Sequence, residues 1–140
     1  MIDRRSVAAE IDAASAAASG LIVVLNRDAF FGIKIGNMLR AQGYRVAFAK
    51  TAQELIAATG AGDPAVLAII DINAKPAWDE LAGVIGGESL PTLAFGSHLD
   101  VEGLRAAKAA GVTRVVSNGD FHRDMLALVR RYARRPSPAQ

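Results

Sequence analysis

Two continuous apolar runs constrain the fold of this chain more than any other feature. Leu21–Leu25 and Val66–Ile70 each place five apolar residues in a row. Runs of this kind are typical of strands in a parallel sheet that is covered by helices on both faces. Between them lie stretches in which apolar residues recur every three or four positions, as on one face of a helix. The chain therefore predicts alternating strands and helices.

Five strands and five helices are predicted between residues 20 and 135. We predict strands over 21–25, 44–48, 66–70, 91–95 and 114–116. We predict helices over 29–42, 51–59, 78–85 and 100–110, and a last helix from Asp120 onward. Alternation with short connections favours right-handed crossovers and one parallel sheet. The expected fold class is a three-layer α/β/α sandwich with the flavodoxin-like strand order 2-1-3-4-5.

Polar residues and glycines mark the expected helix ends. Thr51 and Glu54 have the spacing of a capping box. Asp100 and Asp120 are the expected N-caps of the last two helices. Gly43 is expected to end the first helix.

The chain ends are expected to lie outside the domain that spans 20–135. Residues 1–19 are rich in alanine and carry scattered charges, which predicts a frayed or helical extension. Residues 136–140 contain two prolines and are expected to form a tail. The extension differs from a signal peptide, and no apolar run approaches the length of a membrane span. We therefore expect a cytoplasmic protein that makes no contact with a membrane.

Composition excludes several kinds of chemistry. The chain of 140 residues has no cysteine, so disulfides, thiolate metal sites and cysteine nucleophiles are excluded. Its two histidines, His98 and His122, do not have the spacing of a zinc site. Sixteen basic and 14 acidic residues give a net charge of +2, so a nucleic-acid partner is not expected. No phosphate-binding loop or nucleophile–base arrangement is present, and we expect no enzymatic activity.

A set of polar residues follows the predicted strands and forms the candidate site. In an open parallel sheet, sites form beyond the carboxyl ends of the strands. Asp71, which ends a fully apolar strand, is the most informative of them: it is expected to be a phosphoacceptor, a metal ligand or a ligand anchor, or else a turn-forming aspartate. The other candidate pocket residues are Asn26, Arg27, Asp28, Asn73, Gly96, Ser97, His98 and Asn118.

Several short motifs occur in a characteristic order. They are Leu-Ile-Val-Val before a polar cluster, Gly43-Tyr44 before the second strand, Ile69-Ile70-Asp71 at the end of the third, Pro91 at the start of the fourth, and Ala110-Gly111 before Asn118. In this order and spacing, residues 20–135 resemble the receiver domain of bacterial two-component response regulators. The resemblance implies a signalling module.

The resemblance also implies roles for individual residues. In that family, two acidic residues after the first strand help to hold Mg²⁺, and the aspartate that ends the third strand accepts phosphate. Asp71 falls on the phosphoacceptor, and Asn73 falls on the residue whose carbonyl contacts the metal. Asn26 and Arg27 stand where the acidic pair is expected, or Leu25 and Asn26 if the correspondence is offset by one residue, and only Asp28 could substitute from a shifted position.

Other positions of this chain also depart from the family pattern. The family's serine or threonine after the fourth strand is Gly96, its lysine after the fifth strand is Asn118, and its strand-five aromatic is Val115. A loss of carboxylates and of the lysine weakens both Mg²⁺ binding and phosphoryl transfer. We therefore expect a degenerate receiver, or pseudoreceiver, with Mg²⁺ weakly bound or absent and with only Asp28 and Asp71 as weak metal candidates. Arg27 is a candidate ion-pair partner of Asp71.

The expected function is a stand-alone signalling module that acts by binding a protein partner or by self-association, independently of phosphorylation. The family resemblance places the partner surface on the last two helices and the strand between them. Its candidate residues are Val115, Arg123, Arg130, Arg131 and Arg134. Two alternatives stay open: a small-ligand or nucleotide-binding domain that uses the same strand ends, and a working receiver that is phosphorylated at Asp71.

Overall fold

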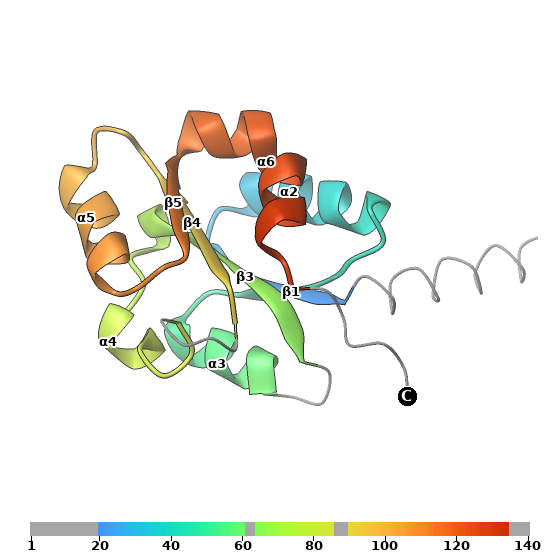
Figure 1. The fold of residues 1–140 in the computed structure, drawn as a ribbon, viewed down its shortest axis with the longest axis horizontal. Coiled ribbons are helices and arrows are strands. Elements are labelled where there is room, and N and C mark those ends of the chain that lie inside the picture. Colours follow the sequence, from blue (N-terminus) through green and yellow to red (C-terminus); the bar gives the residue numbers. More distant parts are fainter. Residues whose placement is uncertain (1–19, 61–63, 86–89, 135–140) are drawn as a thin grey trace, which may run out of the picture.

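The predicted strands form one parallel sheet in the order β2-β1-β3-β4-β5, so the expected topology is confirmed (Figure 1). The computed structural model describes residues 20–60, 64–85 and 90–134. The predicted extension over 1–19 and the tail over 136–140 lie outside these residues. The strands are β1 (Leu21–Leu25), β2 (Arg45–Ala49), β3 (Ala65–Asp71), β4 (Thr92–Gly96) and β5 (Arg114–Ser117).

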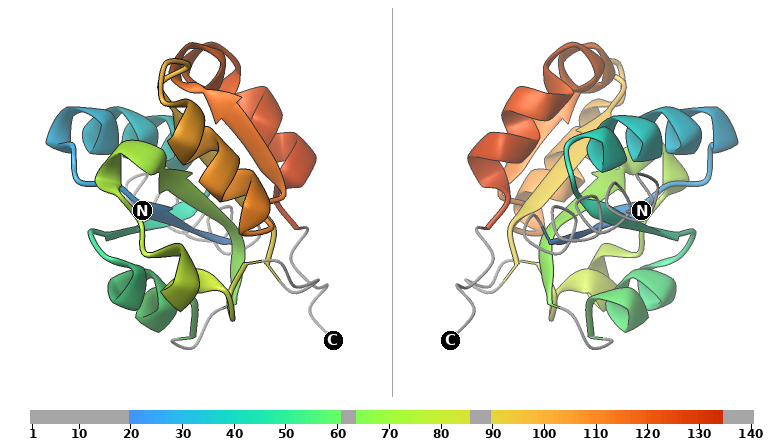
Figure 2. Two further views of the ribbon diagram at one scale, coloured as in Figure 1. Left: turned by 90° about the vertical axis from the view of Figure 1, so that its left-hand side faces the viewer. Right: turned by 90° about the vertical axis from the view of Figure 1, so that its right-hand side faces the viewer.

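Helices cover both faces of the sheet, which makes the predicted three layers (Figures 1 and 2). They are α2 (Ala29–Ala41), α3 (Ala52–Gly60), α4 (Trp78–Leu81), α5 (Val101–Ala109) and α6 (Asn118–Tyr132), with a short 3-10 helix, η1 (Ile72–Ala74), after β3. Helices α2 and α6 pack on one face of the sheet, and α3, α4 and α5 pack on the other.

Alternate residues of β1 supply two separate hydrophobic cores. Ile22 and Val24 pack with residues of α2 and α6, whereas Val23 and Leu25 pack with residues of α3, α4 and α5. All four are fully buried. Complete burial of such a side chain contributes roughly 1.5–3 kcal/mol relative to leaving it exposed. The apolar runs of β1 and β3 are therefore explained by contact with helices on both sides.

The start of α6 differs from the sequence-based expectation. Ser117, and not Asp120, is its N-cap: the Ser117 hydroxyl accepts a hydrogen bond from the backbone N–H of Asp120 at 3.1 Å. The helix begins at Asn118, directly after β5, and has a break at Asp124, whose backbone is non-helical. The largest other difference is at α4, which ends at Leu81 and not at Ile85. Several other boundaries differ from the predicted ones by one residue, as at β4, which begins at Thr92.

An aromatic cluster joins α2, β4 and α6. The ring of Phe95 stacks on that of Phe121 with centroids 4.1 Å apart, and the His122 ring lies 4.7 Å from that of Phe31. Both ring nitrogens of His122 are buried, and neither has a hydrogen-bond partner among the described residues. Burial lowers the pKa of His122, and the charge of Lys34 lowers it further. His122 therefore stays neutral over a wider pH range than an exposed histidine.

Both ends of the described domain meet at the amino end of β3. The backbone N–H of Arg134 donates to the carbonyl of Val66 at 2.9 Å, and the Arg134 guanidinium donates to the carbonyl of Ala65 at 2.9 Å. Gly20, with a φ of +95°, packs so closely on Val66 that a Cβ there would collide with the valine side chain. This junction lies at the amino end of β3, whereas Asp71 lies at its carboxyl end.

Candidate functional site

Asp71 is the last residue of β3, and its side chain is almost completely buried, with 3% exposed. One carboxylate oxygen accepts a hydrogen bond from the backbone N–H of Asn73 at 2.9 Å, and Asp71 thereby caps η1. Burial raises the pKa of Asp71, the Asn73 N–H opposes this shift, and the nearby charge of Asp28 raises the pKa further. The ionised carboxylate is therefore less favoured here than in an exposed aspartate.

The turn from β1 into α2 is held by Asn26 and Asp28. Asn26 is buried, its backbone N–H donates to the carbonyl of Ala49, and its side-chain oxygen accepts from the N–H of Asp28. The Asp28 carboxylate accepts from the N–H groups of Phe30 and Phe31 at 2.9 and 3.3 Å. Asp28 is therefore the N-cap of α2, a role that satisfies amide groups left unpaired at a helix start.

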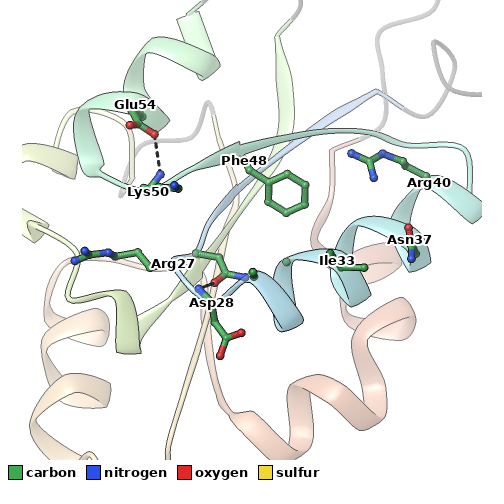
Figure 3. A pocket seen from close by; sticks show the side chains of 11 residues that line it. Arg27, Asp28, Ile33, Asn37, Arg40, Phe48, Lys50 and Glu54 are labelled. Carbon is green, nitrogen blue, oxygen red and sulfur yellow. Dashed lines mark hydrogen bonds between the residues drawn. The ribbon is translucent and has the colours of Figure 1, made fainter.

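The ion pair considered between Arg27 and Asp71 is not formed. Arg27 is exposed, and among the described residues no salt bridge reaches Asp71. In Figure 3 the Arg27 side chain extends away from the Phe48 ring, whereas the Asp28 carboxylate points to a different side of the β1–α2 turn. Within the described part of the chain, the N–H of Asn73 is the one hydrogen-bond donor to the Asp71 carboxylate.

The side chain of Ile72 fills the space beside Gly96, which stands at the family's serine or threonine position. A Cβ on Gly96 would lie 3.0 Å from the Cβ of Ile72 and 3.2 Å from its Cδ1. A Cβ on Gly103, in α5, would lie 2.8 Å from the Cγ2 of Ile72. Ile72 is 4% exposed. The region next to Asp71 is therefore closed by an apolar side chain that packs on bare backbone.

The remaining polar residues at the strand ends have local structural roles. The Ser97 hydroxyl accepts a hydrogen bond from the N–H of Leu99 at 3.1 Å, and His98 is exposed. Asn118, at the family's lysine position, is the first residue of α6. The hydroxyl and amide groups expected to reach toward Asp71 are thus used in turns and helix starts or stand at the surface.

A cavity of about 420 Å³ opens beside this set, between α2, β2 and the start of α3. Of the predicted pocket residues, only Asn26, Arg27 and Asp28 line it. Asp71, Asn73, Gly96, Ser97, His98 and Asn118 do not line it. The structure therefore divides the predicted pocket between a closed region around Asp71 and an open groove beside β2.

Sequence reasoning missed the residues that form the rest of this groove, among them Arg40, Phe48 and Lys50. A signal for them exists in Gly32 and Gly36, which lie one helical turn apart in α2. A Cβ on Gly36 would lie 3.0 Å from the Phe48 ring, and a Cβ on Gly32 would lie 3.6 Å from it. The two glycines let the ring rest against the helix backbone.

The predicted partner surface on β5 and α6 contains arginines that already have partners within the chain. Arg123 pairs with Asp120 and Asp124, and Arg130 donates to Gln42. Arg131 lies over the ring of Tyr132, and Arg134 donates to Ala65. Val115 is half-buried and packs against the core. The contacts of Arg130 and Arg134 tie the last helix and the residues after it to the rest of the domain, and the use of this surface by a partner stays a prediction.

The residues around Asp71 do not fit a tight Mg²⁺ site. Asp28 uses one oxygen to cap α2, Asn26 turns its oxygen to the N–H of Asp28, and Asp71 is buried with one oxygen bound to the N–H of Asn73. Within 20–60, 64–85 and 90–134, no three histidine, aspartate or glutamate side chains gather as metal ligands would. Mg²⁺ requires ionised or strongly polar oxygen ligands in octahedral geometry.

Comparison with known proteins identifies the fold. No family profile and no curated protein matches the sequence. The receiver domain of the TMAO respiratory system response regulator TorR is 13% identical, with a TM-score of 0.70 over 80% of this chain and 94% of that one. CheY4 of Vibrio cholerae is 17% identical, with a TM-score of 0.66 over 81% and 98%. The CheY-like protein tadZ from Pseudomonas aeruginosa is 21% identical, with a TM-score of 0.64 over 81% and 98%.

This protein thus has the fold of response-regulator receiver domains. The chain spans 26% of a further similar structure, NtrX from Brucella abortus, which is 17% identical with a TM-score of 0.67. None of the described helices has both the length and the apolar character needed to cross a membrane.

Proposed function

We propose that this protein is a receiver-like signalling module that works by binding a protein partner or a second copy of itself, and that Asp71 is not a phosphorylated switch. The observation that carries the proposal is the environment of Asp71. Its carboxyl group is buried, has a raised pKa and accepts one backbone hydrogen bond, and no cation among the described residues is paired with it. A buried carboxylate without a paired cation is poorly placed to attack a phosphoryl group, because no positive charge offsets the charge of the incoming oxygens.

The space around Asp71 supports the same conclusion. Phosphoryl transfer depends on cations and hydrogen-bond donors that neutralise the oxygens of the transferred group. Ile72 lies against Gly96, and Asn118 is built into the start of α6. The positions from which a hydroxyl and an ammonium group would approach therefore hold apolar packing and a helix start.

The structural neighbours support the class of function. TorR is a response regulator of a respiratory system, and CheY4 is a chemotaxis response regulator. Receiver domains of this kind are signalling modules and not independent enzymes. We propose the same class for this chain, without a required Mg²⁺ and without enzymatic activity.

Exposure to a phosphoryl donor tests the proposal. The protein is incubated with acetyl phosphate and Mg²⁺, and separately with beryllofluoride and Mg²⁺, and followed by intact mass and backbone amide shifts. A phosphorylatable receiver domain is the positive control, and Asp71→Asn is the matched negative control. We expect no added phosphoryl group on this protein or on Asp71→Asn. For each of the two proteins, we expect the amide spectrum to be the same with and without the donor. An adduct that requires Asp71, with shifts that spread to Val115 and α6, identifies a working phosphoacceptor instead.

A further inference from the structure

The groove beside β2 has an apolar centre with cations at both ends. In Figure 3 Arg27 and Lys50 lie at one end, Arg40 lies at the other, and the Phe48 ring lies between them. Phe48 is 43% exposed and Ile33, on the facing side of α2, is 64% exposed. Both side chains line the same groove, so apolar surface is exposed at its centre, and contiguous exposed apolar surface is one mark of an interaction site.

The Phe48 ring is held in place before any partner arrives. It rests on the backbone of α2 at Gly32 and Gly36, and the guanidinium of Arg40 lies 5.9 Å from the ring centre. A ring that is already positioned loses little conformational freedom when it is covered, so less of the contact energy is spent on ordering it. Phe48 is therefore suited to anchor an apolar side chain.

The charges of the groove favour an anionic partner. Arg27, Arg40 and Lys50 form no salt bridge with any described residue. The two acidic residues of the groove are engaged at helix starts: Asp28 caps α2, and Glu54 accepts from the backbone N–H of Lys50 at 2.9 Å. Both carboxylates keep their negative charge, so three basic and two acidic side chains leave the groove with a net charge of +1.

Asn26 adds a hydrogen-bond donor at the floor of the groove. Its side chain is 94% buried, since 6% is exposed, and its amide nitrogen has no partner. That nitrogen lies 3.4 Å from the position that a Cβ on Gly32 would take, and Gly32 lines the same groove. Buried polar groups are nearly always hydrogen-bonded, and this amide nitrogen has no partner among the described residues. It has no exposed surface, so an incoming acceptor reaches it only after a small movement at the floor of the groove.

We propose that the groove between α2 and β2 binds an acidic peptide segment of a protein partner, in which an apolar side chain lies between acidic residues. The proposal rests on the proposed function, because it names the surface through which this module contacts its partner. The apolar side chain covers Phe48 and Ile33, and the flanking carboxylates meet Arg40 at one end and Arg27 or Lys50 at the other. A carbonyl or carboxylate oxygen of the segment accepts from the Asn26 amide.

The openness of the groove favours a peptide over a small molecule. Nine of its eleven lining residues are exposed, and small-ligand sites usually enclose most of the ligand surface. The presence of Asp28 and Glu54 also disfavours a nucleic acid, whose phosphates bind to surfaces with a stronger excess of cations.

The test uses a fluorescein-labelled peptide with a Leu-Phe centre flanked on each side by two acidic residues. Fluorescence anisotropy measures its binding to the full chain, and amide shifts locate the bound surface. We expect shifts at Ile33, Phe48 and Asn26, and binding that weakens with added salt. Arg40→Glu and Lys50→Glu are each expected to weaken binding about tenfold. Lys108→Glu, the same charge change on the exposed side of α5, leaves binding unchanged.

Two further comparisons keep the proposal falsifiable. Ile33→Ser removes apolar surface from an exposed position without disturbing the core, and it is expected to weaken binding. A peptide with lysine in place of its acidic residues, a short oligodeoxythymidine and inorganic phosphate serve as competing probes. The proposal is overturned if the acidic peptide does not bind, if Lys108→Glu weakens it as much as Arg40→Glu, or if only the nucleic acid or phosphate produces shifts in the groove.

The two proposals fail separately. If the peptide does not bind and Asp71 accepts no phosphate, the groove is excluded and the phosphorylation-independent module stands. If the peptide binds in the groove and Asp71 is phosphorylated, the groove stands and the proposed mode of signalling is excluded.

Discussion

The side chain of Ile72 lies against Gly96 so closely that a Cβ on the glycine would be 3.0 Å from the isoleucine Cβ. The contact joins the residue after Asp71 to the end of the neighbouring strand β4. It explains why a glycine stands where response-regulator receivers have a hydroxyl residue. A side chain at position 96 would crowd Ile72, which would have to shift to make room for it.

Restoring the hydroxyl should therefore destabilise the protein. Gly96→Thr forces Ile72 out of its position, and we expect the free energy of unfolding to fall by roughly 1–3 kcal/mol. Urea unfolding followed by circular dichroism measures the change. Gly119→Ala is the control, because no atom lies within 4 Å of a Cβ there, and it should cause no loss.

A second variant separates crowding from other effects of the threonine. Shortening the neighbour, in Gly96→Thr with Ile72→Val, should recover part of the lost stability, since the two residues share one space. If Gly96→Thr and the double variant lose the same free energy of unfolding, Ile72 is not the obstacle to the threonine.

Asp71→Asn should stabilise the protein at neutral pH. The raised pKa means that the folded state binds the proton of Asp71 more tightly than the unfolded state does. Stability therefore falls as pH rises from the unfolded pKa, about 3.9, through the raised folded pKa, and the loss is complete above it. We expect asparagine to raise the free energy of unfolding at pH 7 by on the order of 1 kcal/mol, and the gain to vanish near pH 4.

Denaturant titrations of both proteins between about pH 4 and pH 7 measure this difference. A loss of stability in Asp71→Asn at pH 7 would contradict the prediction, because it would mean that the native carboxylate is ionised and favourably paired.

His122 should make stability depend on pH near neutrality, whereas the effect of Asp71 begins at acidic pH. Its lowered pKa means that the unfolded state binds more protons than the folded state below the ordinary histidine pKa of about 6.5. Stability therefore falls as pH drops through 6.5, and this loss ends below the folded pKa. His122→Phe should remove this part of the pH dependence, whereas the exposed His98→Gln should keep it. Unfolding midpoints of the three proteins from about pH 5 to pH 8 test it.

The start of α6 provides a direct test of its cap. Ser117→Ala removes the hydroxyl that accepts from the N–H of Asp120, and we expect a loss of about 1 kcal/mol. Asp120→Asn leaves that backbone hydrogen bond intact and should cost less. Thermal and urea unfolding of both variants decide between Ser117 and Asp120 as the residue that stabilises the first turn.

The periodicity of the sequence predicts the sheet because burial on two faces leaves a strong signal. The runs in β1 and β3 have no polar residue, and their order along the chain, with helices between, leaves few possible topologies. Helix ends are less predictable. Ser117 and Asp120 are both good N-caps by residue type, and only the geometry at the end of β5 selects Ser117.

The site could be predicted only in part, for a related reason. Asp71 ends one buried strand and Asn26 directly follows another, so their place at the carboxyl ends of the strands can be derived from the topology. The closure of that edge depends on the packing of Ile72 against the backbone of Gly96. The groove depends on the packing of Phe48 against the backbone of Gly32 and Gly36. Such contacts join residues distant in sequence, and no local pattern reports them.

The meeting of Gly20 and Arg134 at Val66 has a consequence for the connectivity of this domain. Because both ends leave the sheet at one point, a short linker could join them, and the chain could be opened elsewhere, as in a circular permutant. The same geometry allows the domain to be inserted into a surface loop of another protein. In either arrangement the host or linker would lie at the amino ends of the strands, and the groove beside β2 would stay accessible from the opposite edge.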